Sequence, residues 1–160
     1  MRRPAVLAAL TAALALAARA AAPAAIYDDK ADAAAQISRA VRTADRSGLR
    51  VLVDFGANWC GDCRALDANL HRPENAALLA RFVVVHVSIG RFDKNLALAA
   101  RYGVPLDKGV PALAVLDGRG RVIYAQKNGE FEDMRRMDPA EVGAFLRRWS
   151  AAPPRPVSAG

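Results

Sequence analysis

The sequence predicts an α/β fold in which helices flank a central mixed β-sheet. Short, β-branched apolar runs of strand length alternate with longer segments whose apolar residues recur at helical spacing. The strand–helix–strand order early in the chain indicates a parallel pair. Later, Asp117-Gly118-Arg119-Gly120 separates two apolar runs and has the composition of a hairpin turn, which indicates an antiparallel pair.

Strands are expected at residues 50–55, 82–89, 112–116 and 121–125. The second run is almost continuously apolar, which predicts a central position in the sheet with both faces covered. The fourth strand follows the hairpin turn and is expected to run antiparallel to the third.

Helices are expected at residues 31–47, 61–70, 74–81 and 93–102 and from Asp138 onward. Asp28 or Asp29 is expected to cap the first helix, and Gly48 to end it. The last helix begins with Asp138-Pro139-Ala140-Glu141, which supplies a capping acid and a proline at the first helical position. Its expected apolar face comprises Val142, Phe145, Leu146 and Trp149. Residues 126–137 are polar without a clear period and are expected to form a loop.

Residues 1–24 have the layout of a secretory signal peptide. Met1-Arg2-Arg3 is basic, residues 5–18 are apolar, and Ala22-Pro23-Ala24 resembles a cleavage site. An uncleaved anchor is the alternative, although the apolar run is shorter than a membrane span needs. Residues 25–150 then form one domain, and the proline-rich residues 151–160 a disordered tail. The leader predicts a periplasmic or secreted protein.

The net charge of +7 belongs to the whole chain, and removing the three leader arginines lowers it to +4. The remaining Lys and Arg residues are scattered, as on a solvated surface. This pattern does not favour nucleic-acid binding. The mature protein is expected to be a monomer.

Cys60 and Cys63 are the only cysteines, and they lie where the first strand gives way to a helix. Two intervening residues place both sulfurs on one helical turn, close enough to form a disulfide. A structural bridge that closes so small a loop gains little stability, and a domain of this size does not need one. The spacing therefore indicates a redox couple.

The sequence resembles the thioredoxin superfamily over residues 50–149. The segment 53–64, Val-Asp-Phe-Gly-Ala-Asn-Trp-Cys-Gly-Asp-Cys-Arg, is similar to the family's strand and active-site loop. Gly109-Val110-Pro111-Ala112 is similar to its cis-proline loop, and the 117–120 hairpin follows. The resemblance implies a thioredoxin-like sandwich. A second short helix after the active-site helix is similar to the exported group that includes the C-terminal domain of the DsbD-type thiol reductase.

The resemblance assigns roles to the cysteines and their neighbours. Cys60 is the expected nucleophile, because the helix N-terminus favours its thiolate, and Cys63 is expected to resolve the mixed disulfide. Gly61 lets the sulfurs approach. Asp62 is expected to disfavour the Cys60 thiolate and to make the couple reducing, unless its side chain points into solvent.

Other roles fall on residues farther from the cysteines. Asp54 is expected to exchange a proton with the resolving cysteine, or else to be a strand-end acid bonded to backbone. Trp59 is expected to cover one side of the site. The Val110-Pro111 bond is expected to be cis and to offer backbone to an extended substrate. His86 either modulates Asp54 or is a core histidine.

The leader, Asp62 and the resemblance together predict an exported thiol–disulfide oxidoreductase that acts on protein thiols and disulfides as a reductant, with a membrane thiol reductase as the expected electron donor. A redox-active Cys60–Cys63 disulfide needs no cofactor. No metal site is expected, because the spacing of Cys63, His71 and His86 does not match zinc fingers. The alternatives are a binding or assembly module with little turnover, and a narrow maturation factor such as a reductant of cytochrome c cysteines.

Overall fold

The computed structural model describes residues 25–150. The expected signal peptide and tail lie outside these residues. Within them the helices are α1 (Ala33–Ser47), α2 (Gly61–Leu70), α3 (Ala76–Leu79), α4 (Leu96–Arg101) and α5 (Ala140–Ser150), with 3₁₀ turns η1 (Pro73–Asn75) and η2 (Leu106–Lys108). The strands are β1 (Arg50–Gly56), β2 (Phe82–Ser88), β3 (Ala112–Leu116) and β4 (Val122–Ala125). No helix in this part of the chain is long and apolar enough to cross a membrane.

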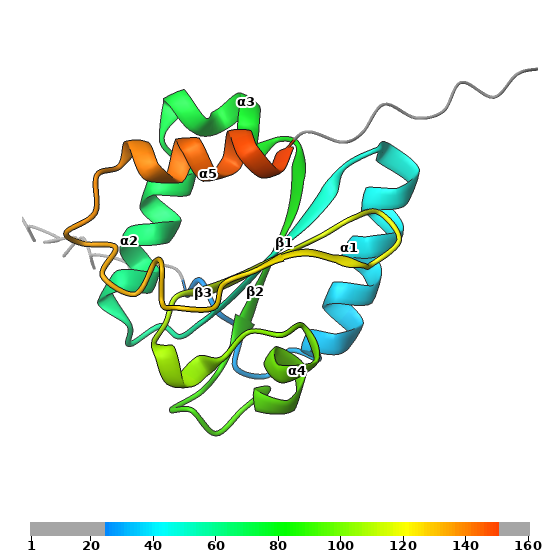
Figure 1. The fold of residues 1–160 in the computed structure, drawn as a ribbon. Helices are drawn as coiled ribbons and strands as arrows, with labels where there is room; N and C mark the ends of the chain where they lie inside the picture. Colours follow the sequence, from blue (N-terminus) through cyan, green and yellow to red (C-terminus); the bar gives the residue numbers. More distant parts are fainter. Residues whose placement is uncertain (1–24, 151–160) are drawn as a thin grey trace, which may run out of the picture.

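The strands form one mixed sheet in the order β2-β1-β3-β4. β1 runs parallel to β2 and antiparallel to β3, and β3 runs antiparallel to β4. Helix α1 covers one side of the sheet, and α2, α3 and α5 lie on the other side (Figure 1). The predicted α/β sandwich around a mixed sheet is therefore confirmed, and so is the antiparallel hairpin.

The prediction of a central position for β2 was wrong, because β2 is an edge strand. Its apolar run reflects two covered faces rather than two neighbouring strands. Val85 and Val87 pack in the core on the α1 side, and Val84 packs against the core on the other side. The interior of the sheet next to β2 is instead occupied by β1, in which every residue from Val51 to Gly56 is buried.

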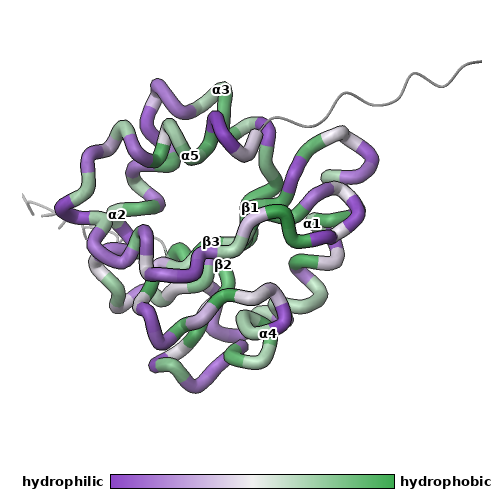
Figure 2. Tube along the Cα trace, in the orientation of Figure 1, coloured by the Kyte–Doolittle hydropathy of each residue, from purple (hydrophilic) through white to green (hydrophobic). Residues whose placement is uncertain are grey.

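Two apolar cores sandwich the sheet. Val51, Val53 and Phe55 of β1 belong to the core beneath α1, and Leu52 belongs to the core beneath α2 and α5. This alternation is the period of a strand whose two faces are both covered. Figure 2 shows hydrophobic stretches along the central strands and a hydrophilic segment between β4 and α5.

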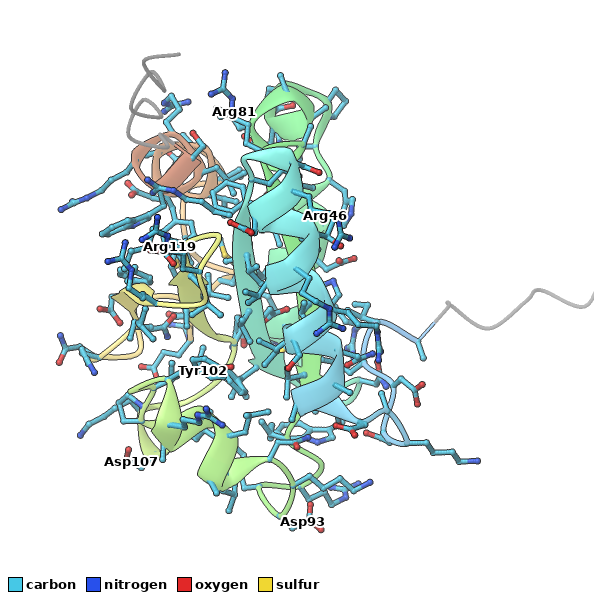
Figure 3. All side chains as sticks on the ribbon, turned by 90° about the vertical axis from the view of Figure 1, so that its right-hand side faces the viewer. Arg46, Arg81, Asp93, Tyr102, Asp107 and Arg119 are labelled. Atoms are coloured by element: carbon cyan, nitrogen blue, oxygen red, sulfur yellow. A yellow bond between two sulfur atoms is a disulfide. The ribbon has the colours of Figure 1, made fainter. Side chains whose placement is uncertain are left out.

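The helix boundaries differ from expectation at two N-termini. Asp32 caps α1 by accepting a hydrogen bond from Ala35 N at 2.9 Å, so the expected cap at Asp28 or Asp29 was wrong. Helix α4 begins only at Leu96, after Asn95 in a left-handed conformation. Figure 3 shows α1 lengthwise in front of the strands, with Asp93 in the loop before α4 and Arg119 in the β3–β4 turn. The expected start of α5 holds, because Ala140 N donates to Asp138 Oδ1 at 2.9 Å.

Candidate active site

Cys60 and Cys63 form a disulfide at the start of α2, with their Cα atoms 5.2 Å apart. Cys60 has extended backbone and caps the helix, and its Sγ accepts from Cys63 N at 3.1 Å. Cys63 lies one turn inside the helix and is fully buried, whereas Cys60 keeps 5% of its surface exposed. The pair therefore has an outer sulfur at a helix N-terminus and an inner sulfur against the core.

The loop before β3 faces the disulfide. The Val110-Pro111 peptide bond is cis, as the resemblance implied, and Val110 O lies 3.6 Å from Cys60 Sγ. Gln126 holds this loop from inside, because its Nε2 donates to Pro111 O at 3.1 Å and its Oε1 accepts from Leu113 N at 3.2 Å. Gln126 is 2% exposed. Sequence reasoning placed it in a polar loop and missed this role.

Asp54 of β1 is fully buried and is bonded to side chains rather than only to backbone. Tyr27 Oη donates to Asp54 Oδ2 at 2.7 Å, and His86 Nδ1 lies 2.9 Å from the same oxygen. The other side of the His86 ring faces α2, with Nε2 3.7 Å from Asp67 Oδ1. The His86 ring therefore connects the buried acid to a carboxylate on α2.

These contacts shift two pKa values. Burial and the neighbouring Asp54 carboxylate raise the pKa of Tyr27 far above its ordinary value, so this phenol stays protonated. Burial lowers the pKa of His86, but the hydrogen bond and charge of Asp54 and the charge of Asp67 outweigh it, and the net shift is upward. His86 thus contacts Asp54 directly, as its modulating role, one of the two considered from sequence, would require.

Tyr27 belongs to the lead-in before α1, and sequence reasoning gave it no role. Asn58, in the active-site loop, fixes this segment. Its Oδ1 accepts from Ile26 N at 3.0 Å and from Tyr27 N at 3.1 Å, and its Nδ2 donates to Tyr27 O at 2.7 Å. The Asn58 side-chain amide thus accepts from and donates to the backbone of residues 26–27, as the backbone of a neighbouring strand would. In the sequence, only the asparagine two residues before Cys60 could have indicated that the lead-in is held at the active site.

Asp62 neither points freely into solvent nor acts as a lone charge. It accepts hydrogen bonds from the backbone N, Nε and Nη2 of Arg135, at 2.9, 3.1 and 2.9 Å. These bonds keep the pKa of Asp62 below its ordinary value. The Arg135 guanidinium also covers Gly61, where an added Cβ would lie 3.3 Å from its Cζ. A larger residue than glycine at position 61 would therefore press on Arg135.

Trp59 lies beside Cys60 with 47% of its surface exposed. Its Nε1 donates to Gly90 O at 2.7 Å, and its ring centroid is 5.9 Å from that of Phe92, which is 42% exposed. Phe92 adopts a left-handed backbone conformation with φ 63°, unusual for a bulky residue. Two exposed aromatic rings therefore stand together next to the redox pair.

The histidines do not gather with the cysteines. His71 Nδ1 lies at the end of α2, 2.8 Å from Asp67 O, and His86 is directed to Asp54. Among residues 25–150, no three His, Cys, Asp or Glu side chains form a group that could hold a metal ion.

Comparisons with known proteins agree with this geometry. A family model described as thioredoxin-like matches residues 32–118. The structure titled a disulphide isomerase from Xylella fastidiosa superposes with a TM-score of 0.77 at 40% identity, covering 81% of this chain and 100% of that one. A thioredoxin from Thermus thermophilus superposes with a TM-score of 0.51 at 28% identity, covering 69% of this chain and 81% of that one.

Two curated proteins match over part of their length. Protein disulfide-isomerase erp38 of Neurospora crassa is 30% identical over 111 residues, which are 68% of this chain and 28% of that protein. Thioredoxin of Streptomyces clavuligerus is 38% identical over 78 residues, 49% of this chain and 64% of that protein. The chain thus spans less than two thirds of either relative. The family model, the fold and the Cys60–Cys63 pair together show that this chain belongs to the thioredoxin-like family and carries the fold of a thiol–disulfide oxidoreductase.

Proposed function

We propose that this protein is an exported reductant that exchanges disulfides with protein substrates through Cys60 and Cys63. One observation carries the proposal. The sulfur that caps α2 lies 3.6 Å from Val110 O, at the cis-proline loop, while its partner sulfur is buried behind it. A substrate disulfide can therefore reach Cys60 first and lie against the Val110 backbone, in the manner of an added strand.

The exchange follows from this order of burial. In the reduced protein, the Cys60 thiolate attacks a substrate disulfide, one Cys60–substrate bond forms and one substrate thiolate leaves. The Cys63 thiol then loses its proton and attacks Cys60 Sγ. The second substrate sulfur leaves with the bonding electrons and takes a proton, and the Cys60–Cys63 disulfide remains. Two electrons and two protons from a membrane thiol reductase would restore the dithiol.

The electrostatics around Cys60 support a reducing couple, but for a different reason than the sequence suggested. Arg135 pairs the Asp62 carboxylate, so Asp62 is not the lone negative charge that was expected to disfavour the thiolate. We expect Val110 O, rather than Asp62, to disfavour the Cys60 thiolate. In the reduced protein it can accept a hydrogen bond from the Cys60 thiol, and this favours the neutral form. A less stable thiolate belongs to a more reducing pair.

The surface beside Cys60 suits a protein substrate. Trp59 and Phe92 expose aromatic rings, and a hollow of about 420 Å³, lined in part by Trp59, Gly90 and Lys94, lies next to them. An apolar side chain that flanks a substrate cysteine can pack on the two rings, whereas the hollow, also lined by Asp29, Arg91 and Asp93, suits a polar group. Within the superfamily, membership of the exported group around the DsbD-type reductase remains part of this proposal.

Disulfide isomerisation is the second candidate, because the similar Xylella fastidiosa protein is named a disulphide isomerase. The reduction potential separates the two. Reference values are about −270 mV for thioredoxin, −180 mV for protein disulfide isomerase and −120 mV for a strong oxidant. Equilibration with glutathione buffers is expected to give a value below about −230 mV here. A value near or above about −180 mV would reject the reductant.

Activity and export need their own tests. Insulin reduction with dithiothreitol is expected to be catalysed by the wild type and lost in Cys60→Ser. An inactive wild type would reject thiol–disulfide exchange and favour a binding module. Expression of the full chain followed by fractionation and intact mass measurement is expected to give a periplasmic protein that begins at Ala25. A full-length cytoplasmic product would reject export.

A further inference from the structure

We propose that the Tyr27 hydroxyl relays the proton between Cys63 and Asp54 when Cys63 resolves the mixed disulfide. The proposal rests on the function above and adds a residue from outside the strand, active-site helix and cis-proline loop. It follows from three observations: the space shared by Tyr27 and Cys63, the hydrogen bond from Tyr27 to Asp54, and the anchoring of Tyr27 by Asn58.

Tyr27 Oη and Cys63 Sγ occupy one small space opposite Gly56. A Cβ added at Gly56 would lie 2.4 Å from Tyr27 Oη and 2.9 Å from Cys63 Sγ. A real side chain does not tolerate such distances, so position 56 must be glycine for the hydroxyl and the sulfur to lie where they do. Tyr27 is 1% exposed and Cys63 is fully buried. Bulk water therefore has little access to this space.

The same hydroxyl donates to Asp54 Oδ2 at 2.7 Å. Asp54 Oδ1 is buried and has no hydrogen-bond partner among the described residues. A phenol with a strongly raised pKa does not give up its proton for long, yet it can accept one proton while donating another. The Tyr27 hydroxyl thus bonds to the buried carboxylate and shares the space opposite Gly56 with the inner sulfur.

Two ionisable side chains contact Asp54: Tyr27 from the lead-in before α1 and His86 from β2. On α2, Asp67 lies on the far side of the His86 ring, and Cys63 shares the space opposite Gly56 with Tyr27 Oη. The His86 side chain is 20% exposed and that of Asp67 is 27% exposed. A proton that arrives at Asp54 therefore has the partly exposed His86 beside it. Of the two side chains that contact Asp54, Tyr27 is the one that shares a space with Cys63.

The proton transfers balance with the exchange. As Cys63 attacks Cys60, the Cys63 S–H bond breaks and its proton passes to Tyr27 Oη, whose own proton moves to Asp54 Oδ2. The Cys60–Cys63 bond forms, and the substrate sulfur departs with the bonding electrons. When the protein is reduced again, the transfer runs in reverse and Cys63 regains its proton.

Removing only the hydroxyl tests the relay. Tyr27→Phe keeps the ring, and Tyr124→Phe on β4 is the matched control. Stopped-flow tryptophan fluorescence with a single-disulfide peptide resolves attack by Cys60 from resolution by Cys63. Tyr27→Phe is expected to leave the first step unchanged and to slow the second by about tenfold or more. The rate of the second step should also depend more strongly on pH, because without the hydroxyl the Cys63 proton must leave to bases in the solvent. Tyr124→Phe should match the wild type in both steps.

Equal rates and pH profiles for the resolving step in Tyr27→Phe and wild type would overturn the relay while leaving thiol–disulfide exchange intact. No peptide reduction by the wild type would instead reject the proposed function. If Tyr27→Phe does not fold, 3-fluorotyrosine is placed at position 27 alone, in a Tyr102→Phe, Tyr124→Phe background. Its ¹⁹F resonance in the reduced protein should move with the ionisation of Cys63. A resonance that does not respond to Cys63 would contradict the relay.

Discussion

The guanidinium and backbone of Arg135 bind the carboxylate of Asp62, 73 residues earlier, through three hydrogen bonds. Phe131 and Met134, in the loop between β4 and α5, are buried in the core, and this places Arg135 next to the start of α2. The Arg135 side chain is 67% exposed, and the pair is therefore worth little to global stability. Its importance is local, because it sets the charge beside the redox cysteines.

Arg135→Gln is expected to raise the titration midpoint of the Cys60 thiol, because Asp62 becomes an unpaired negative charge near it. A surface pair of this kind is worth up to about 1 kcal/mol, so the rise should be below about one pH unit. Thiolate absorbance of the reduced protein at increasing pH measures it. Arg136→Gln is the matched control, since Arg136 pairs with Asp133. An equal rise in both variants, or a fall in Arg135→Gln, would show that the pair does not act on Cys60.

His86 should make stability depend on pH. Its pKa is raised in the folded protein by Asp54 and Asp67, against the effect of burial. The protonated ring therefore contributes its full stabilisation below the ordinary pKa of 6.5, and this contribution is lost as pH rises through the higher folded pKa. Urea unfolding of the oxidised wild type should therefore show a declining free energy across that range.

His86→Asn is expected to remove this decline, whereas His71→Asn, on the exposed end of α2, should retain it. In the wild type, the slope of the unfolding free energy against pH corresponds to less than one proton released per molecule on unfolding. If both variants show the wild-type slope, the protonation of His86 is not coupled to Asp54 as the geometry implies.

Gln126→Leu should destabilise the fold, because Leu113 N and Pro111 O lose their side-chain partner in a buried place. The expected cost is about 1–3 kcal/mol for a buried polar group left without a partner. Thermal or urea unfolding measures it. Gln36→Leu is the control, since Gln36 Oε1 is already buried without a hydrogen bond. An equal loss of unfolding free energy in the two variants would contradict the role of Gln126 in holding the cis-proline loop.

Phe92→Ala should raise the KM for insulin several-fold with little change in kcat, because Phe92 extends the exposed aromatic surface of Trp59 without touching the sulfurs. Val122→Ala on β4 removes a comparably exposed apolar side chain elsewhere. A larger effect on kcat than on KM, or equal effects in the two variants, would remove Phe92 from the substrate surface.

The residues that the sequence identified belong to short local patterns. Cys60 and Cys63 share one helical turn after a buried strand, and Pro111 directly precedes another strand. Their chemistry is set by neighbours within a few residues, and a single sequence records such neighbours directly. The mixed sheet and the hairpin were predictable for the same reason, because each depends on an element and the connection that follows it.

The residues that the sequence missed act through tertiary contacts. Tyr27, Gln126 and Arg135 each reach the site from a segment that looked like a lead-in or a polar loop. Nothing local separates a tyrosine that inserts under the active site from one that packs on the surface. The edge position of β2 was missed for a related reason. An apolar run records how many faces of a strand are covered, but it does not record the strand's neighbours in the sheet.

Intact mass measurement of Cys63→Ser, reduced and then mixed with a single-disulfide peptide, tests the division of labour between the two sulfurs most directly. The outer position of Cys60 predicts an adduct of one protein and one peptide, released by dithiothreitol and absent from Cys60→Ser under the same conditions. No adduct with Cys63→Ser, or an equally abundant adduct formed through Cys63 in Cys60→Ser, would contradict attack by Cys60 and resolution by Cys63.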